Sequence, residues 1–577
     1  MSYNQLSLKE KIGQLFMFGF RGTGISEDTR QLFENNNIGF AILFSRNIET
    51  ISQVKELTRN IHSLGKIPPF IYTDQEGGTV VQFKELRATV ISPMGLAATG
   101  TPRSARKAGQ IIGTEMKDLG VDGVLAPSLD VNYEENNPII GIRSFSDDPE
   151  IVAQYGMEFA VGLSEKGVAC CLKHYPGHGG ATVDSHLDIP VVNISPEYFN
   201  HYCLDPFSRA VRTLRSGIDA IMTAHIIFPA LSPHIATFCP YFINDLLRKK
   251  MHYKGIIMSD CLEMNAVKEH FSPETMVKNA MDTGLDLMIV SHSPDFQKEL
   301  LDALYFQVKK GIIPEKRIDQ SLLRILKLRK KYLPLAFSSS TYSSRNLRAL
   351  RASYASHTSD TSHTSYGAED EGLRMHWGEE EKIADKSITV LRNRKNIIPI
   401  RLWAKTLIIE WGKVQATMPV SSAAKVSYLD QTAKEYLEHV DIEVLDLPTI
   451  NTGNAETGIP SKSIPTDLRD RVSGYDYIIA AVYSRSPNLE RLQAEAIKDL
   501  LSLRSDLIVV ALGNPYDIRH FPLVDTYVVT YGFREVQVQT LFSVLTGFTK
   551  PAGKLPVQIQ NMFPRWSACP QLIRTFS

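Results

Sequence analysis

The segment from Lys173 to His186 reads "KHYPGHGGATVDSH" and carries side chains that can do acid-base chemistry. It holds three histidines, a lysine and an aspartate, and it follows the apolar run "GVACCL", which is typical of a buried strand. Pro176 and Gly177 prevent a helix here, so the segment is predicted to be a loop that begins where a strand ends. A rigid strand can position the reactive side chains of such a loop.

Asp184 lies two residues before His186, close enough for a loop to bring its carboxylate to the imidazole. Such a carboxylate fixes the tautomer and stabilises the protonated ring, as in acid/base pairs. A structural Asp–His hydrogen bond explains the same pattern. A zinc site made of His174, His178 and His186 also remains open, although the broken helix excludes a helical zinc-binding pair. We expect no metal and no other cofactor.

Asp260 occurs in "GIIMSDCLEMNAV", where two interpretations remain open. Asp260 could cap the following helix, with Glu263 completing a capping box. Alternatively, its carboxylate ends a strand and faces a pocket as a nucleophile. A carboxylate nucleophile, a movable acid/base and hydrogen-bonding residues such as Asp74, Arg143 and Lys173 together suit displacement at an acetal carbon.

These residues require a scaffold, and the first 330 residues predict one. Short apolar runs alternate there with amphipathic stretches such as "SARKAGQIIGTEMKDLG". Eight runs are strand-like: "IGQLFMFGF", "IGFAILF", "PPFIYTD", "GVDGVLAPSLD", "GVACCLKHY", "IDAIMTAHI", "GIIMSD" and "LDLMIVS". This pattern indicates repeated βα units with parallel pairing, so the fold class is α/β and the first domain is a (β/α)8 barrel.

Polar residues follow several of these runs, always at the same strand end. They are Asp74, Asp130, Lys173, His174, His225 and Asp260. The carboxyl ends of barrel strands carry the active site because their loops converge on one pocket. We therefore expect these side chains to share a site.

The serine-rich segment 336–370 lacks hydrophobic periodicity and has the composition of a linker. It divides a catalytic barrel at residues 1–335 from a smaller α/β sheet domain at residues 371–577. The strand-like runs of the second domain are "SITVLRN", "TLIIEWG", "YDYIIAAVYS", "DLIVVALGNP" and "TYVVTYG".

The bulk composition limits the partners of this 577-residue chain. It is 43% hydrophobic and 22% charged, as expected of a globular protein. Its 63 basic and 63 acidic residues balance, which argues against nucleic acid or an anionic membrane as a partner and favours a neutral small ligand. The N-terminus lacks signal-peptide features, so we expect a cytoplasmic protein. The six cysteines, including adjacent Cys170 and Cys171, form no disulfide or metal pattern.

Several blocks together resemble glycoside hydrolase family 3, and more narrowly its β-N-acetylglucosaminidase branch. In order and spacing these blocks are "DQEGG" (74–78), "NPIIGIRSFSDDP" (137–149), "KHYPGHG" (173–179), "DSH" (184–186), "MTAHIIFPAL" (222–231) and "GIIMSDCLEM" (255–264). The later "NPYDIRHFP", "TYG" and "PAGKLPVQI" resemble the C-terminal α/β sandwich domain of that family. Each block is weak alone, whereas the combination is specific.

The resemblance implies a retaining exo-β-N-acetylglucosaminidase that works through a glycosyl-enzyme intermediate without a metal and acts on a small-molecule or oligosaccharide substrate. It implies Asp260 as the nucleophile, and His186, polarised by Asp184, as the acid/base on a loop that moves. The residues that it implies for the sugar hydroxyls are Asp74, Arg143, Lys173 and His174, with His225 nearby.

The chain departs from the family pattern at three places. Gly180 and Ala181 stand where Asp-Thr is usual, Thr79 stands where arginine is frequent, and "IAT" (235–237) replaces Pro-Ala-Thr. The first departure concerns the conformation of the acid/base loop. The alternatives are a β-glucosidase-type enzyme of the same family, an N-acetylglucosaminide phosphorylase and an inactive sugar-binding protein. The phosphorylase hypothesis arises because a histidine base would not repel phosphate as a glutamate would.

Overall fold

Eight parallel strands, paired in chain order, close into a barrel. They are β1 (Phe16–Phe18), β2 (Phe40–Leu43), β3 (Phe70–Thr73), β4 (Gly123–Val124), β5 (Ala169–Tyr175), β6 (Ala220–Thr223), β7 (Ile256–Cys261) and β8 (Leu287–Val290). Each predicted run contributes one strand, which confirms the barrel. The computed structural model describes residues 5–83, 90–183, 188–214, 217–333, 378–411, 428–445, 464–483 and 487–569.

The strands are short and apolar and are buried along nearly their whole length, as expected when helices cover the outside of a parallel barrel. The helices are α1 (Leu8–Gly13), α2 (Glu27–Asn36), α3 (Ile51–His62), α4 (Pro93–Ala98), α5 (Pro102–Asp118), α6 (Pro149–Glu165), α7 (Pro196–Tyr198), α8 (Asp205–Leu214), α9 (Asn265–Lys268), α10 (Pro273–Thr283), α11 (Pro294–Lys309) and α12 (Glu315–Tyr332). Short helical segments also occur at η3 (Gly141–Arg143), η4 (Phe199–Leu204) and η7 (Tyr241–Lys250).

Serine-proline pairs set where several of these helices begin. Ser92, Ser272 and Ser293 each accept a hydrogen bond from a backbone N–H in the first turn, and each is followed by a proline. The serine satisfies an amide that has no partner within the helix, and proline fits the first helical position. These caps therefore fix the lengths of the loops between strands and helices.

The second domain is built on a six-stranded sheet in the order β11-β10-β12-β13-β14-β9. Its strands are β9 (Thr389–Asn393), β10 (Thr406–Trp411), β11 (Val440–Leu445), β12 (Tyr477–Val482), β13 (Ile508–Ala511) and β14 (Thr526–Val529). Only β9 runs antiparallel, against β14. Helices α15 (Tyr428–Tyr436), α16 (Thr466–Arg471), α17 (Pro487–Leu503) and α18 (Glu535–Leu545) lie between or after its strands in the chain, and residues 378–384, before β9, are also helical.

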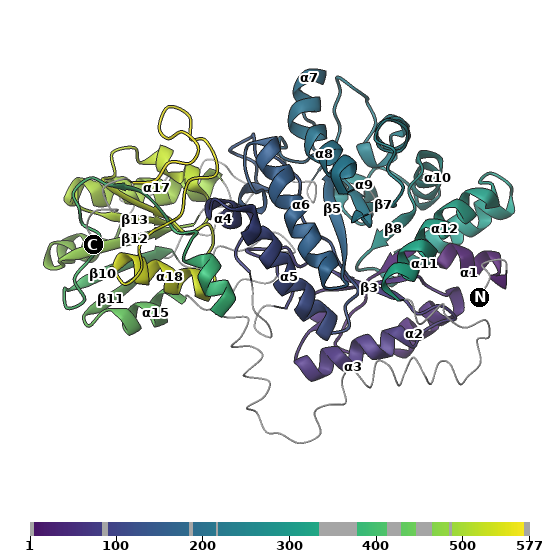
Figure 1. Cartoon of the computed structure of the whole chain (residues 1–577), viewed down its shortest axis with the longest axis horizontal. Coiled ribbons are helices and arrows are strands. Elements are labelled where there is room, and N and C mark those ends of the chain that lie inside the picture. Colours follow the sequence, from purple (N-terminus) through teal and green to yellow (C-terminus); the bar gives the residue numbers. More distant parts are fainter. Residues whose placement is uncertain are drawn as a thin grey trace.

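The two domains pack against each other, with α4 between them (Figure 1). Met94 and Ala98 of α4 belong to the same buried apolar cluster as Tyr531 of the second domain. The last barrel helix ends at Tyr332 and β9 begins at Thr389. The predicted linker, 336–370, lies outside the described residues, so the predicted domain boundaries stay predictions.

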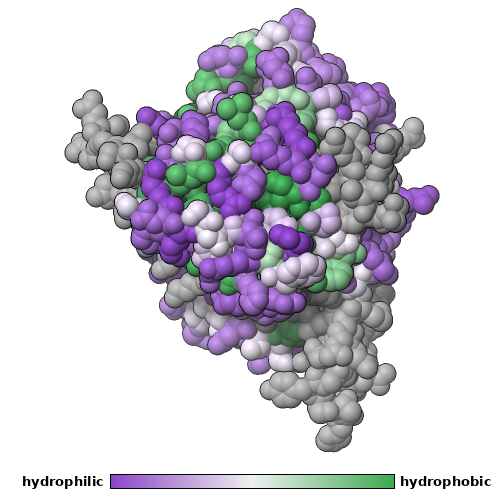
Figure 2. Space-filling view, turned by 90° about the vertical axis from the view of Figure 1, so that its left-hand side faces the viewer, coloured by the Kyte–Doolittle hydropathy of each residue, from purple (hydrophilic) through white to green (hydrophobic). Residues whose placement is uncertain are grey.

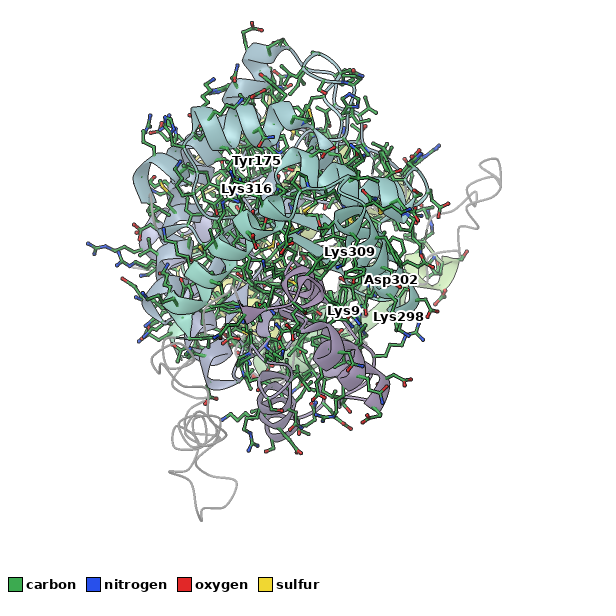
Figure 3. All side chains as sticks on the ribbon, turned by 90° about the vertical axis from the view of Figure 1, so that its right-hand side faces the viewer. Lys9, Tyr175, Lys298, Asp302, Lys309 and Lys316 are labelled. Atoms are coloured by element: carbon green, nitrogen blue, oxygen red, sulfur yellow. The ribbon has the colours of Figure 1, made fainter. Side chains whose placement is uncertain are left out.

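The outer surface carries mixed charge. On the end of the barrel away from the second domain, α11 exposes Lys298, Asp302 and Lys309 (Figure 3). The opposite end, formed by the second domain, shows apolar side chains in separate patches among hydrophilic ones (Figure 2). No helix within the described ranges is long and apolar enough to cross a membrane. The cytoplasmic location stays a prediction.

Candidate active site

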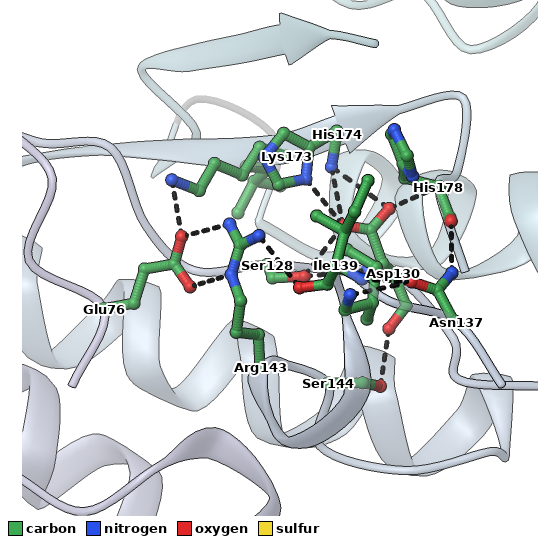
Figure 4. Close-up of polar contacts among 12 residues, drawn as sticks. Glu76, Ser128, Asp130, Asn137, Ile139, Arg143, Ser144, Lys173, His174 and His178 are labelled. Atoms are coloured by element: carbon green, nitrogen blue, oxygen red, sulfur yellow. Dashed lines mark hydrogen bonds and ion pairs between the residues drawn. The ribbon is translucent and has the colours of Figure 1, made fainter. Parts of the chain in front are cut away.

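Lys173 and Arg143 both bind the carboxylate of Glu76 (Figure 4). Lys173 points from the second half of β5, and its Nζ lies 2.6 Å from Glu76 Oε1. Arg143 ends η3 and makes a two-pronged contact, Nε to Oε2 at 2.9 Å and Nη2 to Oε1 at 2.7 Å. Lys173 also pairs with Asp74, which follows β3. We call Asp74, Glu76, Arg143 and Lys173 the charged cluster.

Burial and pairing fix the charges of this cluster. Burial opposes the ionisation of Glu76, which is 1% exposed, but the charges of Arg143 and Lys173 outweigh it and lower the pKa of the carboxyl well below its usual range. Burial likewise opposes the charge on Lys173, while Asp74 and Glu76 raise its pKa above the ordinary value. At neutral pH Glu76, Arg143 and Lys173 are therefore ionised. Asp74, with 26% of its side chain exposed, is the carboxylate of the cluster that is more open to a ligand.

Asp130 forms a second group of hydrogen bonds, with His174 of β5 and with His178 (Figure 4). His178 lies in the loop that begins at Pro176, which we call the histidine-rich loop. The Asp130 carboxylate accepts from His174 Nδ1 at 2.7 Å, from the backbone N–H of His178 at 2.6 Å and from Ser128 Oγ at 2.9 Å. Burial opposes the ionised form, yet the two histidines lower the pKa of Asp130 to about 2. Because an ionised carboxylate only accepts, Nδ1 of His174 carries a proton, and Nε2 is the other hydrogen-bonding atom of that ring.

His178 is buried, and burial is the main reason why its pKa falls to about 4, although Asp130 acts to raise it. The ring is therefore neutral at pH 7 and does not serve as a charged proton donor there. Its ring centre lies 6.0 Å from that of His174. Within the described residues no group of three or more His, Cys, Asp or Glu side chains is arranged to hold a metal ion. The zinc hypothesis involves His186 and stays untested.

Asp260 is the penultimate residue of β7 and is partly exposed. Its Oδ1 accepts from the backbone N–H of Cys261 at 2.7 Å. Its charge acts on Cys171 of β5 and on His178, as expected of a carboxylate at the same end of the barrel as these residues. This position suits a nucleophile that attacks a ligand in the mouth.

The capping-box alternative for Asp260 is wrong. Helix α9 begins at Asn265 with Met264 as its N-cap, so Asp260 lies too far from the helix to cap it. Glu263 instead accepts from the backbone N–H groups of residues 291–293 at 2.6 to 2.7 Å. This carboxylate therefore ties the end of β7 to the segment after β8, at the start of α11.

His225 follows β6 and is 1% exposed. Its Nδ1 lies 2.8 Å from Thr237 Oγ1, and its Nε2 lies 3.1 Å from the carbonyl oxygen of Cys261. The resemblance places His225 only near the sugar. The His225 ring therefore supports the backbone directly after Asp260. This geometry fits a role for His225 in positioning the Asp260 carboxylate.

Asp184 and His186 lie outside the described residues, so their predicted roles stay predictions. The start of their loop is described as far as Val183. At Gly180 a Cβ atom would lie 2.0 Å from the hydroxyl oxygen of Tyr133, and at Gly179 it would lie 1.7 Å from the carbonyl oxygen of Val131. The departure at Gly180 thus has a structural reason, since Tyr133 fills the space of a side chain.

The sequence predicts less about two carboxylates of the site. Asp130 is one of the strand-end residues expected to share the site, but no role is predicted for it, and Glu76, within "DQEGG", is not among the candidate residues. Their signal was a carboxylate after a strand, but their importance comes from partners 67 and 44 positions away. The predicted Asp74, Arg143, Lys173 and His174 do lie together around these two carboxylates.

The fold and the site define a two-domain protein with a carboxylate-rich active site at the mouth of a (β/α)8 barrel. Residues 7–328 match the family described as glycosyl hydrolase family 3 N terminal domain. The chain belongs to glycosyl hydrolase family 3.

Similar proteins support this membership. The chain is 30% identical to "Beta-hexosaminidase A" of Pseudoalteromonas piscicida, over 96% of this chain and 98% of that one. It is 33% identical to "Beta-hexosaminidase" of Nitrosomonas eutropha, over 50% of this chain and 84% of that one. It also resembles the solved structure of a glycoside hydrolase family 3 beta-N-acetylglucosaminidase from Paenibacillus sp. str. FPU-7, with 31% identity and a TM-score of 0.80, over 96% of this chain and 99% of that one.

Proposed function

We propose that the protein is a retaining exo-β-N-acetylglucosaminidase that releases terminal β-linked N-acetylglucosamine. The observation that carries the proposal is that the likeness to a beta-hexosaminidase and to a beta-N-acetylglucosaminidase structure spans both domains. The geometry supports it because a partly exposed carboxylate on β7 faces the same barrel mouth as a set of ionised hydrogen-bonding groups. A retaining glycosidase needs a carboxylate nucleophile of this kind beside an acid/base.

In the proposed reaction a carboxylate oxygen of Asp260 attacks the anomeric carbon, and the bond from that carbon to the leaving oxygen breaks. The leaving oxygen takes a proton from His186, whose ring Asp184 would orient. The same histidine then removes a proton from water, which attacks the glycosyl ester and frees Asp260. The proton that His186 gave up is thereby restored.

The charged cluster and His174 would hold the sugar. Asp74 can accept from hydroxyl groups, whereas Arg143 and Lys173 donate, and His174 Nε2 offers one further hydrogen-bonding atom. Because ion pairs fix these side chains before the sugar arrives, little side-chain freedom is lost on binding. Binding of neutral hydroxyls by preorganised charges is the role that we assign to this cluster.

Parallel assays with an aryl N-acetyl-β-glucosaminide and an aryl β-glucoside test the proposal. We expect turnover of the N-acetylated substrate, and prolonged chelator treatment should leave its rate unchanged. Turnover of the glucoside alone would place the enzyme in the other branch of the family. Binding without turnover of either substrate would identify a sugar-binding protein.

A further inference from the structure

Arg534 of the second domain contacts the turn that follows Glu76 of the charged cluster. Arg534 is the N-cap residue of α18 and is 8% exposed. Its Nε donates to the carbonyl oxygen of Gly78 at 2.9 Å, across the domain boundary. Gly78 lies in the turn directly after Glu76, the carboxylate that holds both cations of the cluster. A side chain of the second domain thus contacts the turn on which the binding groups depend.

This turn is closely packed and has little freedom to move. Gly77 and Gly78 have φ values of 93° and 57°, which favour glycine. The amide of Glu76 donates to the carbonyl of Val80 at 2.9 Å, and that of Gly78 donates to the carbonyl of Val90 at 2.8 Å. A shift of the Gly78 carbonyl would therefore carry Glu76 with it.

Arg534 is itself held in place by the loop between β14 and α18. Tyr531 has a φ of 56°, an uncommon value for a non-glycine residue, which persists only where the surroundings fix it. Its carbonyl accepts from Ser92 Oγ at 2.6 Å, and Gln537 Nε2 donates to the carbonyl of Thr530 at 2.8 Å. The guanidinium therefore meets the turn from a rigid support.

We infer that Arg534 is a positioning residue of the sugar-binding site, through which the second domain holds Glu76 in register with Arg143 and Lys173. The inference rests on the proposed glycosidase function. Its chemical basis is a hydrogen bond from a charged donor to a buried carbonyl, which is stronger than one between neutral groups. Loss of this contact would loosen the binding groups while leaving Asp260, on β7, in place.

Arg565 provides a matched control. It too crosses the domain boundary, with Nη2 at 2.9 Å from Asp147 and Nη1 at 3.0 Å from Asp148, at the start of α6. Both substitutions, Arg534→Ala and Arg565→Ala, remove an arginine that joins the domains, but only the first removes a contact to the Gly78 turn. Equal changes in kinetics would therefore show that both arginines act only through domain packing. A change in Arg534→Ala alone would show that Arg534 positions the Gly78 turn.

The test measures KM and kcat for an aryl N-acetyl-β-glucosaminide in the full-length wild type, Arg534→Ala, Arg534→Lys and Arg565→Ala. We expect Arg534→Ala to raise KM about tenfold with kcat within about threefold, Arg534→Lys to recover part of this loss, and Arg565→Ala to stay within about twofold of wild type. Unchanged kinetics in Arg534→Ala, or the same change in Arg565→Ala, would overturn the inference.

Hydrogen exchange separates a failure of the inference from a failure of the proposed function. An inactive wild type would refute the function, whereas the amides of Glu76 and Gly78 still report on the turn. Faster exchange of both amides in Arg534→Ala but not in Arg565→Ala would support the positioning role. Exchange that is equal in wild type and Arg534→Ala would overturn it even if the enzyme is active.

Discussion

The two sides of the barrel mouth are built differently. On the side of β3 to β5, the charged cluster consists of ion pairs in which Glu76 and Lys173 are almost fully buried. On the side of β7, Asp260 is partly exposed, and backbone contacts of Glu263 and His225 secure the chain around it. In the proposed function, the first design fixes charges that would hold a neutral ligand. The second would leave a carboxylate accessible for attack while the chain around it is held in place.

Substitution of Asp260 should produce the largest effect. We expect Asp260→Ala to lower kcat for an aryl N-acetyl-β-glucosaminide by several orders of magnitude while the fold survives, because the covalent route is lost. Glu263→Gln is the matched variant at the same strand end. It should lower the melting temperature, because it weakens three backbone hydrogen bonds, and keep most of kcat. Normal turnover in Asp260→Ala would contradict the assignment.

His186→Ala should give the next largest effect, and its size should depend on the leaving group. Departure of a poorly activated alcohol requires protonation, so we expect a loss of about 10²- to 10⁴-fold for such substrates. A nitrophenolate leaves without help, so its release should suffer much less. Rates measured across a series of aryl leaving groups check this. A uniform loss over the whole series would show that His186 is not the acid.

On the binding side, Glu76→Gln should raise KM more than it lowers kcat and should cost stability. The variant leaves the buried Lys173 and the mostly buried Arg143 with one carboxylate fewer, for which about 3 kcal/mol is a typical loss. Asp74→Asn is the informative partner, because this carboxylate is partly exposed. It should weaken sugar binding with a smaller loss of stability. Calorimetric titration with N-acetylglucosamine measures the loss of sugar binding in each variant, and thermal melts measure the loss of stability. Equal stability losses would remove the distinction between the two carboxylates.

The sequence predicts the local features of this molecule well. All eight barrel strands are visible as apolar runs because both of their faces are buried, which makes the pattern continuous. Strand β11 was missed because it is an edge strand whose apolar residues alternate with Asp441 and Glu443 and are mostly half-exposed. A short alternating run of this kind gives a weak signal.

The site was less predictable than the scaffold, for a physical reason. A residue at a strand end is visible in the sequence, whereas its partner depends on how distant strands pack. Neither the bond between Glu76 and Arg143 nor the one between Asp130 and His174 follows from spacing. A capping box at Asp260 fits the local sequence rules, yet the Glu263 carboxylate instead accepts hydrogen bonds from the backbone amides after β8. Tertiary contacts decided between local alternatives.

The lowered pKa of Asp130 leads us to expect that the free energy of unfolding depends on pH. Its pKa falls from 3.8 to about 2 in the folded state, so it contributes about 2 kcal/mol of stability above pH 4 that is lost as the pH falls from about 4 to about 2. Asp130→Asn should be less stable than wild type at pH 7, and the gap should narrow below pH 4. Urea unfolding followed by circular dichroism at a series of pH values measures this gap. A gap that stays constant with pH would refute the role of the charge.

The smallest predicted effect concerns the acceptor that attacks the glycosyl-enzyme. Formation of the ester removes the negative charge of Asp260 at the stage when an anion could approach, and a neutral His186 would not repel phosphate. The charged cluster provides two carboxylates and two cations, so it supplies no net positive charge to attract phosphate. We therefore expect mainly N-acetylglucosamine, with a minor share of its 1-phosphate in phosphate buffer. Product analysis by ³¹P NMR, with sulfate at equal ionic strength as the control, measures that share. Free N-acetylglucosamine alone, formed at equal rates in both buffers, would exclude the phosphate route and leave water as the acceptor.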